Sequence, residues 1–193
     1  MMIIDDSLRS VMEKRKTTRR LVHGRMPRQA FNDLVWAAYG HTHSDKAVKM
    51  RTAPSAGATY PIEIHCALED VGDIQDGLYV FDSRTEELRL SIRGRHFAAI
   101  QAAALDQEFV TKSNLIIFMV YNPALIVADY GEISFKYAAF ECGHIAQNIM
   151  LMATSLGLGS VPVGAFEERV LAKVIGISDD KEVMYFVAVG MLA

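Results

Sequence analysis

Apolar positions recur along the chain with two different periods, and these periods predict separate helices and strands. Steps of three and four residues predict a first helix over residues 7–16, capped by Ser7, and a second over residues 28–39. Pro27 opens the second helix and Gly40 ends it. Shorter helices are predicted at residues 96–105 and 167–175.

Strands are predicted where apolar residues alternate or run without interruption. The run LIIFMVY, residues 115–121, is continuous and rich in β-branched residues, which is typical of a buried strand. The polar residues 41–49 predict a loop. Because helices and strands interleave without strict alternation, the pattern indicates an α+β fold. The other predicted strands are residues 62–68, a hairpin of residues 78–82 and 87–92, and residues 183–189.

Residues 132–156 predict one long helix, about 37 Å in length at 1.5 Å per residue. A stripe of small residues on this helix would let another backbone approach closely: Ala139, Gly143, Ala146, Met150, Ala153 and Gly157. The opposite side is also apolar, so the helix must be buried on all sides. Either its own domain surrounds it or it is buried in a dimer.

Composition and charge narrow the class of protein. The 193 residues suit one domain, and the apolar fraction of 51% supports a packed core. A net charge of −3 favours binding to neither nucleic acid nor an anionic membrane surface. Cys66 and Cys142 form no C-x-x-C pair, and the N-terminus has no signal-peptide pattern. We therefore expect a soluble cytoplasmic protein without a membrane span.

The segment RKTTRRL, residues 15–21, is the first candidate for chemistry. Its basic and hydroxyl side chains could hold a phosphate. Each guanidinium group can form two parallel hydrogen bonds to phosphate oxygens, and the hydroxyls add neutral donors. The same residues could instead form a solvated basic end of the first helix, which suits the helix dipole. Taken alone, the segment favours this second interpretation.

A second candidate is APSAGATYPIE, residues 53–63. Ser55 stands in a pattern similar to the nucleophile elbow of esterases, which needs a strand before the serine and a helix after it. The polar residues before Ser55 and the proline Pro61 after it predict neither element. The small residues instead leave backbone N–H groups uncovered, and a flat ligand could lie against them.

A third candidate is GLGSVPVG, residues 157–164, whose glycines are similar to those of dinucleotide-binding proteins. The predicted order of helix, glycines and strand is the reverse of the Rossmann fingerprint, which excludes that site. Gly164 and Ala165 again offer bare backbone after a strand. His41 and His43 have no acid or cysteine at ligand spacing, so no metal site is predicted.

These three segments, in this order, resemble motifs of the nitroreductase-like flavoprotein family over almost the whole chain. The basic segment is similar to the family's R-R-S-x-R element. APSAGATYPIE is similar to the P-S-A-G-x-x-Y-P-x-E of the SagB-type dehydrogenase branch, and residues 143–166 to its G-H-x-A-Q-N…A…G-L-G…P-x-G-x-F run. The resemblance implies a single domain over residues 1–193. Its expected fold is a central antiparallel or mixed sheet flanked by helices, with a long central helix at a dimer interface.

The resemblance also implies a homodimer with FMN at each of two subunit interfaces. The phosphate end of FMN would be held by Arg15, Lys16, Thr17 and Arg19. The partner subunit would contribute Pro54, Ser55, Ala56 and Gly57. The residues along the edge of the ring would be Pro162, Val163, Gly164 and Ala165.

The function that the resemblance implies is FMN-dependent oxidoreduction. NADH or NADPH would give a hydride to flavin N5 and leave, and a small acceptor such as a nitroaromatic or quinone would then take the electrons in ping-pong order. One alternative is a SagB-type dehydrogenase that oxidises a peptide azoline. Another is a flavin-binding protein without turnover, and a hydrolase acting through Ser55 ranks last.

The sequence also departs from the family pattern. Many members carry a flavin-bonding Asn near the position of Ala58, and many return a basic tail to the phosphate where this chain ends at Ala193. Azoline-oxidising members use a Lys-Tyr pair. Lys136-Tyr137 matches that pair, but Asp129-Tyr130 aligns about as well and lacks the lysine. We therefore do not transfer azoline oxidation on this pair alone.

Overall fold

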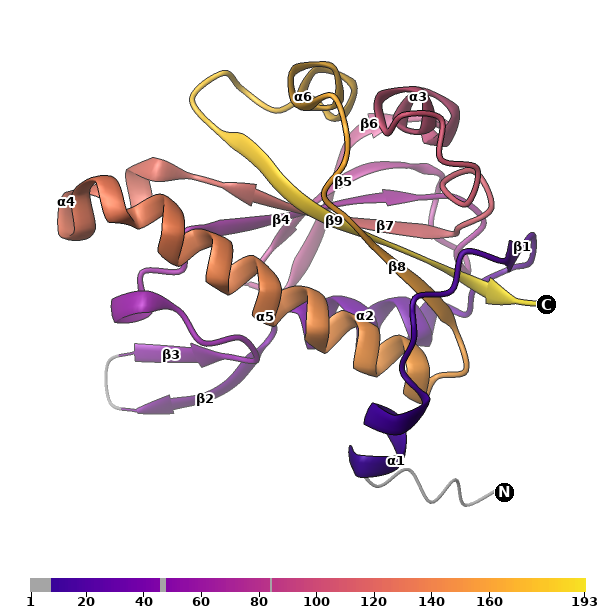
Figure 1. The fold of residues 1–193 in the computed structure, drawn as a ribbon, viewed down its shortest axis with the longest axis horizontal. Coiled ribbons are helices and arrows are strands. Elements are labelled where there is room, and N and C mark those ends of the chain that lie inside the picture. The colour runs from indigo at the N-terminus through magenta and orange to yellow at the C-terminus, as the bar shows by residue number, and fades with distance from the viewer. Residues whose placement is uncertain (1–7, 46–47, 84) are drawn as a thin grey trace.

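A sheet of antiparallel strands forms the centre of the computed structural model, which describes residues 8–45, 48–83 and 85–193 (Figure 1). From one edge to the other its strands are β1 (Leu21–Val22), β9 (Glu182–Leu192), β7 (Leu115–Tyr121), β4 (Ile62–Leu68), β5 (Gly77–Asp82) and β6 (Glu87–Arg93). A further strand, β8 (Gly159–Val163), pairs with β9 beside β1. The antiparallel sheet and its flanking helices confirm the predicted α+β fold class.

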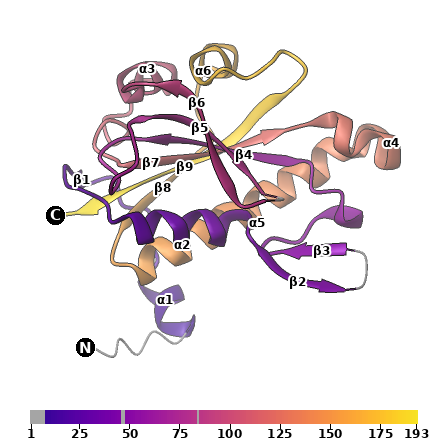
Figure 2. The same ribbon diagram turned by 180° about the vertical axis from the view of Figure 1, so that it is seen from behind.

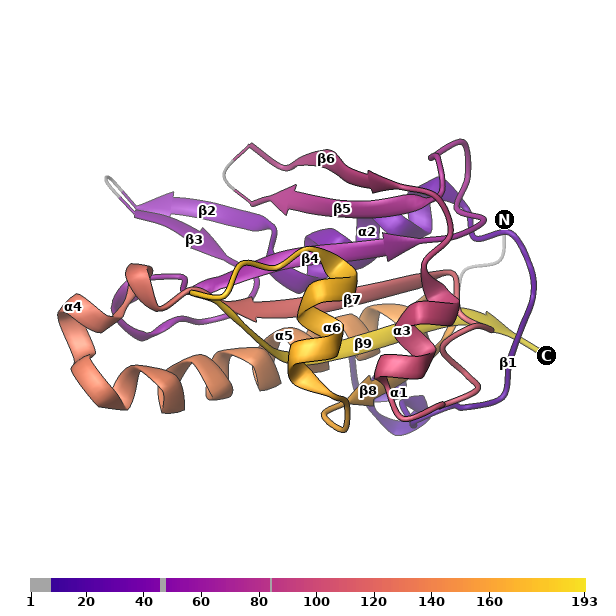
Figure 3. The same ribbon diagram turned by 90° about the horizontal axis from the view of Figure 1, so that it is seen from above.

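Strand β7 occupies the middle of the sheet because all its side chains are aliphatic or aromatic, and all are buried. Successive side chains of a strand point to opposite faces of the sheet, so β7 contributes side chains to two hydrophobic cores, one on each face. Ile117 packs on the side of α2 (Arg28–Tyr39) and α5 (Ser134–Ser155). Phe118 packs on the side of α3 (Phe97–Ala103) and α6 (Glu168–Ile175). Helices therefore cover both faces of the sheet (Figures 1 and 3).

Several predicted boundaries are confirmed to the residue, namely those of α2, β4 and β7. Helix α1 (Leu8–Lys14) ends two residues before the predicted end. The chain leaves the helix there because the following segment runs beside β8, where the Thr18 N–H donates to the Ser160 carbonyl at 3.0 Å. The predicted cap, Ser7, lies outside the described residues.

The loop predicted over residues 41–49 is wrong. The segment forms a hairpin of β2 (His41–Asp45) and β3 (Val48–Arg51), whose connecting residues 46–47 lie outside the described part of the chain. A two-stranded ribbon is held by its backbone hydrogen bonds and needs no apolar face, so the polar sequence gave no alternating pattern to detect.

Helix α5 matches the long helix of the prediction, but burial on all its sides is wrong for one subunit. Phe135 and Phe140 are 46% and 53% exposed. The small-residue stripe is also divided, since Ala139 and Gly143 are exposed whereas Ala146 and Ala153 are buried. The division arises because β8 returns along the C-terminal half of the helix and leaves the N-terminal half open (Figure 1).

Four short helical turns complete the described chain: η1 (Ala56–Ala58), η2 (Pro123–Leu125), α4 (Val127–Tyr130) and η3 (Gly131–Ile133). Three of them lead into α5, and η1 follows β3. Seen from behind, α2 lies across the same face of the sheet as α5 (Figure 2). Within the described ranges, no helix has both the length and the apolar character needed to cross a bilayer.

Candidate functional site

The basic segment of residues 15–19 is held against the start of β8. Thr17 forms a parallel bridge with Ser160, and β1 just beyond the segment pairs with the last residues of β9. Arg15 is half-buried, and Lys16 and Arg19 are exposed. Across the ranges that the structure describes, no carboxylate lies within 4.0 Å of any of these three cations. The segment is therefore a cluster of positive charge without an acidic counterpart.

The segment from Pro54 to Gly57 is wound tightly on itself. The Ser55 hydroxyl oxygen accepts the Tyr60 N–H at 2.9 Å, and the Ser55 carbonyl accepts the Ala58 N–H at 3.2 Å. Gly57, Ala58 and Tyr60 all have positive φ, between 51° and 56°. Positive φ is uncommon for residues with a side chain, so only the surrounding bonds keep Ala58 and Tyr60 in this state.

Gly57 also permits the close approach of another part of the chain. A Cβ at this position would lie 2.5 Å from the Tyr130 hydroxyl, so Tyr130 would have to move to make room for it. Tyr130 in turn packs edge-on against Tyr137 of α5, with ring centroids 5.2 Å apart. At least one of the small residues in this segment, Gly57, is therefore explained by a contact within the subunit.

The nucleophile elbow lacks its helix in the structure. The expectation that no strand precedes Ser55 is wrong, because β3 ends at Arg51. However, a 3₁₀ turn follows the serine in place of the required helix. Ser55 instead contributes its hydroxyl to the turn.

The third segment is the end of β8 and the residues after it. Val163 is buried and pairs with Phe186 of β9, whereas Gly164 and Ala165 are exposed. A Cβ on Gly164 would meet only the Tyr185 ring, at an ordinary contact distance of 3.6 Å, so the subunit itself does not require glycine there. The order of helix, glycines and strand is confirmed, with Gly157 in the left-handed conformation that ends α5.

The structure places the first segment beside the start of the strand that carries the third. Residues 15–19 adjoin β8 at Ser160, and β8 begins just after α5 and runs back along its C-terminal half. The segment from Pro54 to Gly57 lies near Tyr130, at the other end of that helix (Figure 1). One subunit therefore does not join all the predicted site residues in one place.

A buried polar cluster beneath Ser55 was not predicted from the sequence. The Tyr39 hydroxyl donates to Glu141 Oε1, and both residues are almost fully buried. The Arg51 guanidinium lies 4.6 Å from the centre of the Tyr39 ring and 4.9 Å from that of Tyr60, and donates to the Tyr39 carbonyl at 3.0 Å. The signal was present in the sequence, because Glu141 is an acid within an otherwise apolar stretch of helix.

Burial dominates the electrostatics of this cluster. It raises the pKa of Glu141 to about 7, although hydrogen bonds from Ser55 and Tyr39 and the charge of Arg51 act in the opposite direction. The pKa of the Tyr39 hydroxyl is also well above its ordinary range, because burial and the adjacent Glu141 disfavour the phenolate. Glu141 can therefore exchange a proton near neutral pH.

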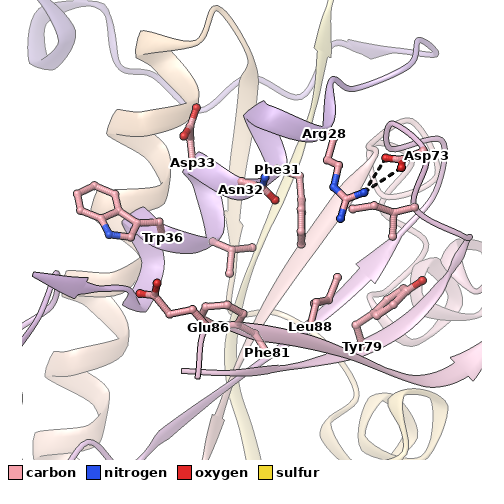
Figure 4. A pocket seen from close by; sticks show the side chains of 12 residues that line it. Arg28, Phe31, Asn32, Asp33, Trp36, Asp73, Tyr79, Phe81, Glu86 and Leu88 are labelled. Carbon is pink, nitrogen blue, oxygen red and sulfur yellow. Dashed lines mark hydrogen bonds and ion pairs between the residues drawn. The ribbon is translucent and has the colours of Figure 1, made fainter. Parts of the chain in front are cut away.

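A separate groove lies between α2 and the β5–β6 hairpin, with a volume of about 630 Å³ (Figure 4). Its apolar side chains include Phe31, Phe81 and Leu88. Arg28 and Asp73 also line the groove and form an ion pair at 2.9 Å. None of the predicted site residues lines this groove. It is therefore distinct from the basic segment and β8.

Comparisons with known proteins agree with this fold. The sequence profile of the nitroreductase family matches residues 12–191. A protein of Methanocaldococcus jannaschii named "Putative nitroreductase MJ1384" is 33% identical over 172 residues, which are 89% of this chain and 85% of that protein. The crystal structure of a "putative nitroreductase" from Ralstonia eutropha JMP134 is 26% identical, with a TM-score of 0.84 over 100% of this chain and 86% of that one.

Two more distant structures share the fold. One is a "putative nitroreductase" from Desulfovibrio desulfuricans in complex with FMN, 16% identical, with a TM-score of 0.66 over 98% of this chain and 88% of that one. The other belongs to the Escherichia coli microcin synthetase complex McbBCD with truncated pro-MccB17 bound, 16% identical, with a TM-score of 0.78 over 100% and 75%. Since the family profile spans nearly all of the sequence, this chain belongs to the nitroreductase family.

Proposed function

We propose that this chain is an FMN-dependent oxidoreductase that works as a homodimer and reduces a small acceptor at the expense of NADH or NADPH. The observation that carries the proposal is the cluster of Arg15, Lys16 and Arg19, fixed against β8 without an acidic partner in the part of the chain that the structure describes. We further propose that residues 1–193 act as a single FMN-binding domain in the cytoplasm.

The basic segment fits the phosphate end of FMN in the chemistry of its donors. Arg15 and Arg19 can each form two parallel hydrogen bonds to phosphate oxygens, and Lys16 adds a point charge. Thr17 supplies a hydroxyl beside them. Because β8 and β9 hold both ends of the segment, its cations need little further ordering when an anion binds.

The end of β8 fits the edge of a flat ring. Pro162 and Val163 are fixed by pairing with β9, and the small side chains of Gly164 and Ala165 leave the next stretch of backbone uncovered. The subunit gives no steric reason for the glycine, because a Cβ there would make only an ordinary van der Waals contact with the Tyr185 ring. A ligand that needs close contact with the backbone supplies such a reason.

A second copy of the chain would complete the site. The segment of Pro54, Ser55, Ala56 and Gly57 lies at the far end of α5 from the cations, so a copy packed along α5 could deliver its own segment to them. The open half of α5 suits such packing, because Phe135 and Phe140 are exposed beside Ala139 and Gly143. Exposed aromatic side chains of this kind are typical of an interface.

FMN, when bound, would supply the redox chemistry that carries a hydride equivalent from NADH or NADPH to the acceptor in ping-pong order. The polypeptide has simpler tasks. Arg15, Lys16, Thr17 and Arg19 hold the anionic end, Pro162, Val163, Gly164 and Ala165 position the ring edge, and the segment from Pro54 to Gly57 excludes water on the partner's side. The acceptor is a small molecule similar to a nitroaromatic or a quinone.

A SagB-type dehydrogenase that oxidises a peptide azoline is the alternative function. It is favoured by the motifs shared with that branch and by the fold shared with the McbBCD chain. Tyr137 packs on Tyr130 next to Gly57, whereas the Lys136 amine lies 5.7 Å from the centre of the Phe140 ring on an exposed side of α5. A flavin-binding protein without turnover is a further possibility that the same experiment separates.

The visible spectrum of the purified protein tests these functions. The proposed function predicts flavin absorbance that NADH or NADPH bleaches and that air, a quinone or a nitroaromatic restores. Bound flavin that neither nucleotide bleaches favours the protein without turnover, and oxidation of an azoline peptide with reduction of the flavin favours the dehydrogenase. A colourless protein that takes up no added FMN contradicts all three.

Replacing both arginines tests the phosphate assignment. Arg15→Ala with Arg19→Ala should weaken FMN binding by about 100-fold, because each removes a charge-assisted hydrogen bond of about 1.5 kcal/mol or more. The measurement is the Kd for FMN from quenching of its fluorescence. Arg89→Ala with Arg169→Ala is the matched control, since both arginines are exposed and lie on β6 and α6. Equal affinity in the first double variant and the parent would refute the assignment.

A further inference from the structure

The groove between α2 and the β5–β6 hairpin has the size and the lining of a small-molecule site (Figure 4). Its volume of about 630 Å³ lies within the range of ligand pockets. Buried aromatic side chains line both of its walls, with Phe31 on α2 and Phe81 on β5. A ligand with an apolar body gains free energy when it displaces water from such walls.

Trp36 adds an exposed aromatic ring whose position is fixed. The side chain is 46% exposed, yet its indole Nε1 donates to the His41 carbonyl at 3.2 Å. The ring also packs on Gly40, where a Cβ would lie 2.3 Å from the Trp36 Cδ1. Because Gly40 has a φ of −68°, this close packing explains the glycine better than the backbone conformation does. The ring is thus held in place before a ligand binds, which lowers the ordering cost of binding.

Glu86 contributes a carboxylate on the same side of the groove as Trp36 (Figure 4). Its Oε1 accepts the His41 N–H at 2.8 Å, so the carboxylate and the indole are both bonded to the main chain of one residue. Within the described residues, Oε2 has no hydrogen-bond partner, and no cation lies within 4.0 Å of this carboxylate. One oxygen therefore holds the side chain in place, and the other can accept a bond from a ligand.

The charges around the groove favour a cationic ligand. Arg28 lines the groove but is paired with Asp73 at 2.9 Å. Asp33 accepts the Gln29 amide at 2.8 Å and, in the part of the chain that the structure describes, has no cation within 4.0 Å. With Glu86, the described lining has three carboxylates against one guanidinium, an excess of two negative charges. Such a lining attracts an ammonium group and repels a carboxylate.

We propose that this groove binds a small organic amine with an apolar body. The ammonium group lies between the Trp36 ring and the Glu86 carboxylate, where it is attracted by the π electrons of the ring and donates an N–H to Oε2. The apolar body lies along Phe31 and Phe81. None of the predicted FMN-binding residues lines the groove, so the amine site does not depend on the function proposed above.

Trp36 reports on this binding directly, because it is the only tryptophan in the sequence. The probe is 4-phenylbutylamine, titrated into the purified protein while the tryptophan emission and the indole ¹⁵N–¹H resonance are followed. We expect both signals to saturate with a Kd of about 1 mM, as suits a ligand of this size. The neutral analogue 4-phenylbutanol should bind about tenfold more weakly, because it lacks the charge. Equal binding of the amine and the alcohol, or no saturation by about 10 mM amine, overturns the proposal.

Glu86→Gln tests the carboxylate. The amide oxygen of the variant can still accept the His41 N–H, but the charge is lost. The Kd for the amine should rise about tenfold, and the Kd for the alcohol should not change. Glu87→Gln is the matched control, because Glu87 is exposed and does not line the groove. An unchanged amine Kd in Glu86→Gln, or an equal rise in Glu87→Gln, overturns the assignment. If Glu86→Gln fails to fold, the preference of the parent for the amine over the alcohol decides the proposal.

Discussion

Two buried or half-buried carboxylates, on opposite faces of the sheet, have opposite electrostatics. Glu63 at the start of β4 has its pKa lowered from 4.5 to about 2, and Glu141 in α5 has its pKa raised from 4.5 to about 7. Glu63 faces the side of α3 and α6, because its neighbours Ile62 and Ile64 pack toward α5. The same side chain is thus held ionised in one region and made protonatable in the other.

The difference comes from the number of donors that reach each carboxyl. His65 favours the ionised form of Glu63 most strongly, and the Lys181 amine and Asn122 amide donate to it at 2.7 to 2.9 Å. Glu141 accepts the Tyr39 hydroxyl, and Ser55 and the charge of Arg51 also favour its ionised form. Burial therefore decides the state of Glu141, whereas hydrogen bonds decide that of Glu63.

The largest expected effect is on the pH dependence of stability at Glu141. Its pKa is higher in the folded state than in the unfolded state, so the folded apoprotein loses stability as pH rises from 4.5 to 7 and then no further. We expect Glu141→Gln to abolish this loss, which amounts to about 3 kcal/mol. Urea unfolding of parent and variant at pH 5 and pH 8, at one fixed protein concentration, measures the difference. A parent and variant whose stabilities run parallel across this range would show that Glu141 is ionised throughout.

A smaller effect of opposite sign is expected at Glu63. Its pKa is lower in the folded state, so its contribution is complete above pH 4.5 and is lost as pH falls toward 2. Glu63→Gln should lower the free energy of unfolding at pH 7 by about 1–2 kcal/mol, less than the pKa alone suggests because solvent screens a side chain that is 27% exposed. Denaturation at pH 7 and pH 3 should show the gap narrowing at the lower pH. If the stability difference between the parent and the variant were larger at pH 3 than at pH 7, the lowered pKa of Glu63 would be contradicted.

The smallest effect is expected from removing one donor of the Glu63 group. Lys181→Gln should cost about 1 kcal/mol or less at pH 7, because the amine is partly exposed. The Glu63 carboxyl should then titrate above pH 2 but below 4.5, since His65 and Asn122 remain. Carboxyl ¹³C resonances followed from pH 2 to 6 measure this midpoint. An unchanged midpoint would mean that His65 and Asn122 alone keep Glu63 ionised.

Much of the fold could be predicted because burial leaves a periodic trace in the sequence. The continuous run of β7 predicted the central strand, and the helical spacing of α2 predicted its boundaries. The β2–β3 hairpin was not predicted, because its pairing depends on backbone hydrogen bonds that leave no periodic pattern of apolar side chains. The exposure of Phe140 was not predicted, because the helical pattern does not show which element covers each side of α5.

The candidate site was predicted less completely than the fold. The segments at residues 15–19 and at the end of β8 were identified from their composition, and the structure places the first of them beside Ser160, at the start of the same strand. Their role toward FMN stays a prediction. Glu141 and Tyr39 were missed because their meeting depends on how α2 packs against α5, which the local pattern does not contain. The left-handed Ala58 and Tyr60 were missed because glycine is the usual marker of that conformation.

The pairing of β1 with the end of β9 links the two extremes of the polypeptide. Leu21 and Val22 are aligned with Leu192 and Met191, directly after the basic segment. Fraying of this short pairing would loosen the arginines at the other end of the sequence. If the proposed function holds, substitutions confined to Met191 and Leu192 therefore reduce the yellow colour that the protein retains during purification.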